Sequence, residues 1–581
     1  MLSFMLVLCL LALISALTAA CGPGQPPTTP AGSGDTTFRR LAKDILDDRY
    51  RRHPSEATDL GLHQYDDQLE DRSQAAIGAE LEALKNFRSK LIAVDPTSLT
   101  QTSALDREQL LHAIDEGVLR IDTIRMWAKD PDTYSGTVTN AAYVIMKRAY
   151  APASERLKAL IAREKKMPAA LEQARTNLTS PVRIYTEIAI EQLDGNISFF
   201  KRDVPAAFKD VADQTLLAEF TQVNGEVLRA LEEYKVFLQR ELLSKATTTF
   251  AYGADTYVKA LAAFENVDLP LDRLLQIAEA DRQRNEAAFQ ATANMLDPKK
   301  SAEQVLASLQ VDHPAPDKLL LVTQNTLDSI RQFIVDRRIV TIPPSDPARV
   351  KETPPFMRST TSASMDTPGP FETATLDAFY NMTLPDPRRP RAEQADYMRQ
   401  WYYAAITNVS VHEVYPGHYI QFLYAKSFPS DVRKVFGAST NSEGWAHYCE
   451  QMMLDEGFHA DEPRYRLAQL QDALLRDVRF IVGLKMHTQG MTLDEATRLF
   501  ETAAHQPHPV AVQEAKRGTA DALYGYYTLG KLMILKLRDD YRAKTGSEYS
   551  LQRFHDAFIG IGPLSLPLIR RAMLGEVGTV L

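Results

Sequence analysis

The sequence predicts a mainly α protein with a short β-ribbon or small sheet. Long stretches carry apolar residues three and four positions apart, as in residues 81–94 and 216–243, and this spacing is typical of amphipathic helices. The same periodicity returns after Arg391 and continues towards the C-terminus. Strand signals are few, and the clearest is the β-prone run at residues 379–383.

The composition argues against a disordered chain and against a nucleic-acid-binding protein. Of the 581 residues, 45% are hydrophobic and 24% are charged, as in ordinary globular proteins. The 66 basic and 75 acidic side chains give a net charge of -9, which provides no electrostatic footprint for nucleic acid. We therefore expect a folded protein with no nucleic-acid partner.

The N-terminus has the features of an export signal. Residues 1–20 are apolar, uncharged and end in small residues, as a signal peptide does. Residues 21–37 are rich in Pro, Gly, Ser and Thr, which predicts a flexible tether. The segment from Leu17 to Cys21 resembles a bacterial lipobox, with Thr18 where such sites usually have Leu.

These features predict an exported protein that is anchored by lipid on Cys21 to a bacterial membrane, facing the periplasm or the cell exterior. An uncleaved membrane helix and an ordinary signal peptidase site are the alternatives.

The rest of the chain divides by composition into two parts. Residues 38–340 are predicted to form an N-terminal helical lobe, and residues 341–581 a loop and strand region followed by a second helical lobe of the same domain. Ten prolines between Pro343 and Pro390 mark the loop region. A strand there would offer an edge with which an extended peptide can pair; a connecting ribbon that binds nothing is the alternative.

The segment His412–His418, HEVYPGH, is the most informative motif. It begins like the zinc-binding motif H-E-x-x-H, in which two His one helical turn apart hold a metal beside a catalytic Glu. The second His comes six residues after the first, about 240° round a regular helix. Both imidazoles can reach one ion only if the helix is interrupted, and Pro416 and Gly417 predict that interruption.

A third ligand is expected on a nearby helix, because catalytic zinc sites usually have three protein ligands and one open position. Glu443, His447 and Glu450 fall on one face of a predicted helix. Glu443 is the first choice as ligand, and His447 competes with it. Glu450 is placed to hold a ligand His through its second ring nitrogen.

HEVYPGH followed by SEGWAHYCE resembles the large bacterial family known as domain of unknown function 885, which contains many lipoproteins and is similar in its core to helical zinc peptidases. The likeness extends over nearly the whole mature chain, from HPSEATDLGLHQYDD to FHDAFIGIGPLSLPLI. It implies a large zincin-like helical body around a central cleft. It also implies one zinc ion per chain, bound by His412, His418 and Glu443, with Glu413 as general base.

The resemblance also suggests that His487, Arg517 and Tyr527 line the cleft. There Tyr527 or His487 would donate to the oxyanion that forms during hydrolysis. Arg517 and Lys531 are candidate anchors for a substrate carboxylate.

The expected function is zinc-dependent hydrolysis of peptide bonds in small peptides, with metal-activated water and Glu413 as the group that moves its proton. The alternative is a non-catalytic surface lipoprotein that binds metal or peptide. Glu413 favours the enzyme, because a site that only binds metal needs no carboxylate next to its first ligand.

Overall fold

The computed structural model describes residues 32–354, 358 and 361–581. The predicted signal peptide and Cys21 lie outside these residues. The prediction of a mainly helical fold with a small sheet is confirmed. None of the helices in the described ranges combines the length and the hydropathy of a membrane-spanning segment.

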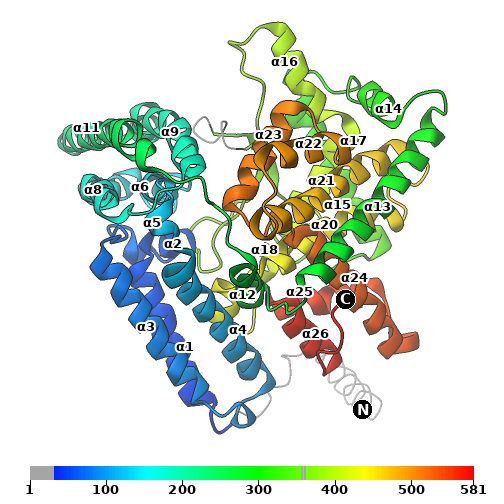
Figure 1. The fold of residues 1–581 in the computed structure, drawn as a ribbon, viewed down its shortest axis with the longest axis horizontal. Helices are drawn as coiled ribbons and strands as arrows, with labels where there is room; N and C mark the ends of the chain where they lie inside the picture. Colours follow the sequence, from blue (N-terminus) through cyan, green and yellow to red (C-terminus); the bar gives the residue numbers. More distant parts are fainter. Residues whose placement is uncertain (1–31, 355–357, 359–360) are drawn as a thin grey trace, which may run out of the picture.

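The N-terminal helices form one side of the molecule (Figure 1). Local capping fixes several of them: Ser73 accepts a hydrogen bond from the Ala76 N–H, and Thr100 from the Ser103 N–H. Their buried residues form separate apolar cores, one of which includes Leu160, Phe200 and Leu231. The helices are α1 (Asp35–Arg52), α2 (Pro54–Asp59), α3 (Gln74–Ile92), α4 (Gln101–Val118), α5 (Met126–Lys129), α6 (Asp132–Met146), α7 (Ala153–Glu164), α8 (Met167–Asn177), α9 (Arg183–Ser198), α10 (Val204–Phe208) and α11 (Gln214–Phe237).

The remaining helices form the main body, on the other side of Figure 1. Its largest apolar core joins α12, α13 and α15 to the helices that follow the sheet, so packing crosses the boundary predicted at residue 340. The helices are α12 (Ala254–Glu265), α13 (Leu271–Leu296), α14 (Ala302–Leu309), α15 (Leu319–Arg337), α16 (Arg391–Met398), α17 (Tyr403–Glu413), α18 (His418–Ala425), α19 (Asp431–Val435), α20 (Ser439–Asp455), α21 (Pro463–Thr488), α22 (Leu493–Ala503), α23 (His508–Ala520), α24 (Tyr526–Thr545), α25 (Leu551–Ile561) and α26 (Leu566–Leu574).

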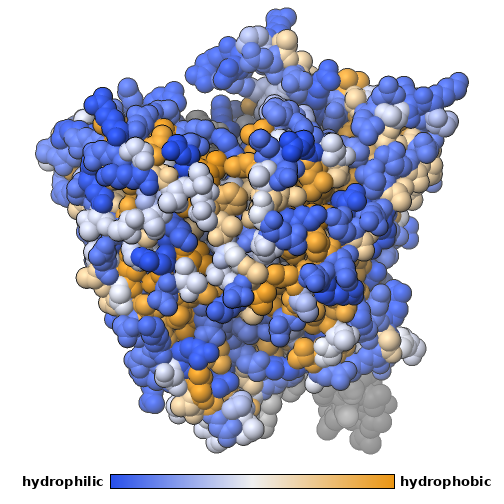
Figure 2. Space-filling view, viewed as in Figure 1, coloured by the Kyte–Doolittle hydropathy of each residue, from blue (hydrophilic) through white to orange (hydrophobic). Residues whose placement is uncertain are grey.

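The face shown in Figure 2 is mostly hydrophilic, with hydrophobic residues in small groups between the polar ones. This distribution is expected of a folded chain whose large apolar side chains lie inside.

A three-stranded sheet lies in the proline-rich region. Its strands are β1 (Arg349–Glu352), β2 (Ala363–Asp366) and β3 (Phe379–Met382), in the order β1-β3-β2. The strand predicted at residues 379–383 is confirmed as β3, which is parallel to β1 and antiparallel to β2. Among the described strands, β2 pairs only with β3, so it is an edge strand.

Candidate metal centre

The predicted interruption between the two histidines is confirmed. Helix α17 ends at Glu413 and α18 begins at His418. Gly417 is required at the turn, because a Cβ atom there would lie 1.8 Å from the carbonyl oxygen of His412. The turn brings the rings of His412 and His418 to a centroid distance of 4.9 Å, nearly perpendicular to each other.

Glu443 on α20 completes a group of three possible metal ligands. Its Oε2 atom lies 3.5 Å from Nε2 of His412 and 3.4 Å from Nε2 of His418. Two ligands at about 2.0–2.1 Å from a tetrahedral zinc ion are about 3.4 Å apart, so these separations fit such an ion. The three ligand atoms all lie within 4.8 Å of one another.

The state of Glu443 Oε2 is a second sign that the site fits a cation. The atom is buried and accepts no hydrogen bond from any residue that the structure describes. A buried carboxylate oxygen without a donor is costly unless a cation meets it. The structure thus brings together all three ligands predicted from the sequence.

Glu450 holds His412 through the ring nitrogen that does not face Glu443, as predicted. Its Oε1 atom lies 2.7 Å from Nδ1 of His412, which leaves Nε2 of that ring facing Glu443. Nη2 of Arg476 lies 3.0 Å from the same carboxylate oxygen. Although burial opposes it, the charge of Arg476 holds the pKa of Glu450 well below its usual range. Burial also opposes the protonated form of His412, but the neighbouring carboxylates of Glu443 and Glu450 raise its pKa to about 10.

His447 contacts Glu450 and is not one of the three possible metal ligands. Its Nδ1 atom is 3.1 Å from Oε2 of Glu450, and its side chain is fully buried. Burial and the nearby charge of Lys531 lower the pKa of His447 to about 3, so the ring is neutral. The competing assignment of His447 as a ligand therefore has no support from the geometry.

Glu413 faces the edge of the sheet. Its Oε2 atom accepts a hydrogen bond of 3.2 Å from the backbone N–H of Met365 in β2. The carbonyl of Ser362, just before β2, points to β3 and accepts a hydrogen bond from the Thr383 N–H. The direction of the backbone N–H and C=O groups alternates from one residue to the next along a strand. The N–H of Met365, three residues further on, therefore points away from β3, towards the free edge of the sheet. Glu413 and the free edge of β2 thus border the same space.

Tyr527 on α24 borders the centre from another side. Its ring centroid lies 6.3 Å from that of His412. Arg517 on α23 donates from Nη2 to the Tyr527 hydroxyl over 3.5 Å and to the Tyr526 hydroxyl over 3.2 Å. Arg517 also pairs with Asp521 at 3.1 Å. A phenol that accepts from Arg517 keeps its own proton for another acceptor.

Two of the predicted site residues, His487 and Lys531, have structural roles instead. His487 is buried, its Nε2 lies 2.8 Å from the Gly518 carbonyl, and its Nδ1 accepts from the Tyr252 N–H. Both ring nitrogens are engaged by backbone groups, and burial lowers the pKa of His487 to about 4. Lys531 is fully buried and its Nζ pairs with Asp281 at 3.0 Å. Neither side chain can meet a substrate in this arrangement. The predictions that His487 lines the cleft and that Lys531 anchors a substrate carboxylate therefore have no support from the geometry.

Comparison with known proteins places the chain in a family. Residues 54–573 match the family described as "Bacterial protein of unknown function (DUF885)". The chain belongs to this family. No curated protein matches it.

Two solved structures resemble this DUF885 protein over almost their whole length. One is "a putative lipoprotein of unknown function" from Shewanella oneidensis, with 26% identity, a TM-score of 0.78, and coverage of 92% of this chain and 99% of that one. The other is "the putative lipoprotein" from Colwellia psychrerythraea, with 18% identity, a TM-score of 0.79, and coverage of 94% and 99%. The second likeness shows a shared fold.

Sequence reasoning missed two arginines that border the centre of this DUF885 protein. The guanidinium groups of Arg476 and Arg479 on α21 lie 5.5 and 5.3 Å from the ring centroid of Tyr527. Arg479 makes two bonds of 2.7 Å to Glu514. The available signal was their spacing of three residues, which puts both on one face of a helix that is otherwise largely apolar.

Proposed function

We propose that this protein is a zinc-dependent peptidase that hydrolyses peptide bonds of small peptides, with Glu413 as general base. The observation that carries the proposal is the convergence of two imidazole nitrogens on one buried oxygen of Glu443 that accepts no hydrogen bond from the described residues, with Glu413 directly after His412 in the chain. Two imidazoles and one carboxylate are a donor set of catalytic zinc sites, which leave a fourth position open.

The ligands and their supports have distinct tasks. His412, His418 and Glu443 would hold the ion, and Glu450 would keep His412 in the tautomer with Nε2 free. When bound, zinc supplies Lewis-acid chemistry, because it polarises carbonyl oxygens and acidifies water.

Proton transfer is assigned to Glu413. Its bond to the Met365 N–H orients the carboxylate, so it can take a proton from the attacking water and pass it to the leaving amine. The Tyr527 hydroxyl, fixed by Arg517, would donate to the oxygen on which negative charge develops. Arg517 also carries the positive charge that would attract the carboxylate of a short peptide.

The edge of β2 supports a peptide as the substrate. An extended peptide can pair with backbone groups of an edge strand, and this edge meets Glu413 at Met365. A net charge of -9 gives no reason to expect a nucleic-acid partner.

We place the protein on the outer side of a bacterial membrane, attached by lipid on Cys21. The apolar residues 1–20 and the lipobox-like end of that run support export and lipidation. Both proteins of similar structure are described as lipoproteins. Replacing Cys21 with Ala should release the protein from the membrane fraction.

The test combines metal content with cleavage of fluorogenic peptides by the purified mature protein. Wild-type protein should bind about one zinc per chain, Glu443→Ala should lose it, and His447→Ala should keep most of it. Glu413→Gln should keep zinc and lose at least about 100-fold in cleavage rate. Glu456→Gln, which changes an exposed carboxylate at the end of α20, is the matched control. Undiminished cleavage by Glu413→Gln, or by protein stripped of metal, would defeat the proposal.

A further inference from the structure

A cavity of about 420 Å³ adjoins the metal centre. Three of its lining residues are linked to the centre: Met365 binds Glu413, Phe422 follows His418 by one helical turn, and Ser442 directly precedes Glu443. The Phe422 ring lies 6.3 Å from the His418 ring. The volume is within the range of about 300–1,000 Å³ usual for ligand pockets.

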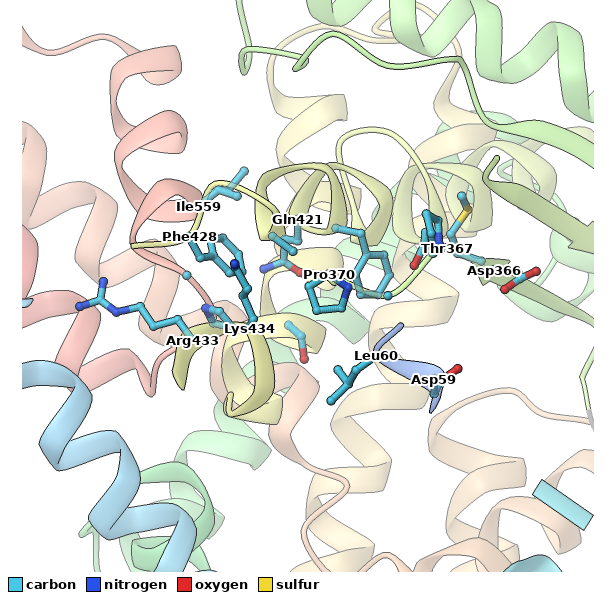
Figure 3. A pocket seen from close by; sticks show the side chains of 18 of the residues that line it. Asp59, Leu60, Asp366, Thr367, Pro370, Gln421, Phe428, Arg433, Lys434 and Ile559 are labelled. Atoms are coloured by element: carbon cyan, nitrogen blue, oxygen red, sulfur yellow. The ribbon is translucent and has the colours of Figure 1, made fainter. Parts of the chain in front are cut away.

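The walls of this cavity come from both sides of the molecule (Figure 3). Leu60 follows α2 in the N-terminal part, whereas Gln421 belongs to α18 and Ile559 to α25 of the main body. Arg433 and Lys434 lie on one side of the view, and Asp366 and Thr367 lie on the opposite side.

Apolar side chains provide much of the lining. Phe422 is 46% exposed although it is a large aromatic residue, and it both lines the cavity and lies near the ring of His418. Leu60, Phe428 and Ile559 add apolar surface from three other segments. An exposed aromatic residue in the lining of a largely apolar cavity is typical of a site that receives an apolar group.

The charged side chains that line the cavity already have partners. Each is held in an ion pair, and so none is left to neutralise a charge on a ligand. The pairs are Asp59 with Lys147, Asp366 with Arg148 at 2.6 Å, Arg433 with Asp106 at 2.6 Å, and Lys434 with Asp431 at 3.1 Å. A charged ligand group would lose its hydration here without gaining a free counter-charge.

The loop that forms one wall is seated firmly on the N-terminal part. A Cβ atom on Gly369 would lie 2.3 Å from the carbonyl carbon of Leu60, and one on Gly61 would lie 2.4 Å from the Glu372 nitrogen. His63 adds a bond of 3.0 Å to Glu372. The cavity is therefore formed before any ligand enters it.

We propose that this cavity receives a large apolar side chain, such as Phe, Leu or Met, of the substrate residue next to the bond that is cut. The inference rests on the proposed peptidase function and names its substrate class: short peptides with a bulky apolar residue beside the scissile bond. A small side chain would leave the cavity unfilled, and a charged one would find no free partner in it.

The test uses zinc-loaded protein and a panel of quenched fluorescent peptides, in which each of the two residues flanking the cleaved bond is varied in turn. At one position, kcat/KM should be at least about tenfold higher for Phe, Leu and Met than for Gly, Asp and Lys. Ala425→Trp and Leu60→Trp fill the cavity from the main body and from the N-terminal part, respectively, and should abolish this preference. Lys426→Trp is the matched control, because Lys426 is exposed and lies outside the lining. Zinc content and thermal unfolding show that each variant is folded.

The outcomes separate this inference from the function on which it rests. Cleavage without apolar preference, or a preference that survives both cavity-filling variants, overturns the inference and leaves the peptidase intact. If the wild-type protein cuts no peptide, the proposed function fails. The cavity is then judged by titrating zinc-loaded Glu413→Gln with the same peptides, where equal affinity for the Phe and Gly versions overturns the inference.

Discussion

Gly444 and Gly530 meet backbone to backbone where α20 crosses α24. A Cβ atom on Gly444 would lie 2.5 Å from the Cα of Gly530. Glu443 directly precedes Gly444, and Tyr527 lies three residues before Gly530, on the same side of its helix. The close crossing therefore sets the position of a metal ligand relative to the proposed oxyanion donor.

The variant Gly530→Ala tests this crossing. The new methyl group would lie 2.0 Å from the Thr440 carbonyl oxygen, so the helices must separate. Overpacking of this kind costs about 1–3 kcal/mol, and we expect a lower midpoint of thermal unfolding together with weaker zinc binding. Gly560→Ala is the control, because nothing lies within 4 Å of a Cβ atom there. Equal midpoints and equal zinc affinities for the two variants would show that the crossing of α20 and α24 accommodates the added methyl group.

Replacing Glu450 with Gln tests the support of the first ligand. The change removes the charge that His412 and Arg476 share, so His412 loses its orientation. Zinc affinity should fall about 10- to 100-fold, as measured by competition with a fluorescent chelator. Gln451→Ala alters the next residue, whose side chain donates a hydrogen bond to the exposed Asp455, and should leave affinity unchanged. An unchanged affinity in Glu450→Gln would mean that the ligands are held by packing alone.

The parts of the site that were predictable share one property: their signal is local. The break between His412 and His418 follows from Pro416 and Gly417, which act on the backbone where they stand. Glu443 and Glu450 share a helical face, so their relation to each other is also fixed within a few residues. The strand at residues 379–383 was visible for the same reason.

The errors concern residues whose environment is set by distant segments. The sequence suggests Lys531 as a substrate anchor, but in the fold its ammonium pairs with Asp281, which lies 250 positions earlier in the chain. Both ring nitrogens of the buried His487 form hydrogen bonds with backbone groups, one with the Tyr252 N–H and the other with the Gly518 carbonyl. No periodicity within one helix reports whether a polar side chain meets solvent or a buried partner from another helix.

The two candidate anchors, Lys531 and Arg517, should respond differently to truncation. Burial lowers the pKa of Lys531 to about 8, although the nearby Asp477 opposes this. Lys531→Ala removes one of the two cations that pair with the buried Asp281 and leaves it only Arg284, so it should reduce thermal stability, by up to the roughly 3–5 kcal/mol that breaking a buried pair costs. Arg517→Ala, with its partly exposed side chain, should change stability less and raise KM for peptides with a free C-terminal carboxylate.

Peptides whose C-terminus is amidated provide the control for Arg517. Their KM should be similar in wild-type and Arg517→Ala protein, because they lack the carboxylate. A change in KM of the same size for amidated and free peptides would assign Arg517 to another task. A Lys531→Ala protein as stable as the wild type would show that Arg284 alone is a sufficient partner for Asp281.

Glu164 at the end of α7 should make the protein less stable as the pH rises. Both of its carboxylate oxygens are buried and have no hydrogen-bond partner among the described residues, and burial raises the pKa of this group to about 9. In the unfolded chain the group ionises at its usual value near 4.5. The folded state therefore binds one more proton between these values. Stability should fall by about 1.4 kcal/mol per pH unit across this range, and this group should add no slope below it.

The variant Glu164→Gln keeps the shape of the side chain and removes its titration. Its free energy of unfolding, measured by urea titration at pH 5, 6.5 and 8, should exceed that of the wild-type protein by an amount that grows with pH. Glu155→Gln, at an exposed position in the first turn of the same helix, should differ from wild type by the same small amount at all three pH values. A difference for Glu164→Gln that is constant with pH would mean that the folded protein ionises Glu164 as readily as the unfolded chain does, and that water or a local opening reaches this part of the N-terminal core.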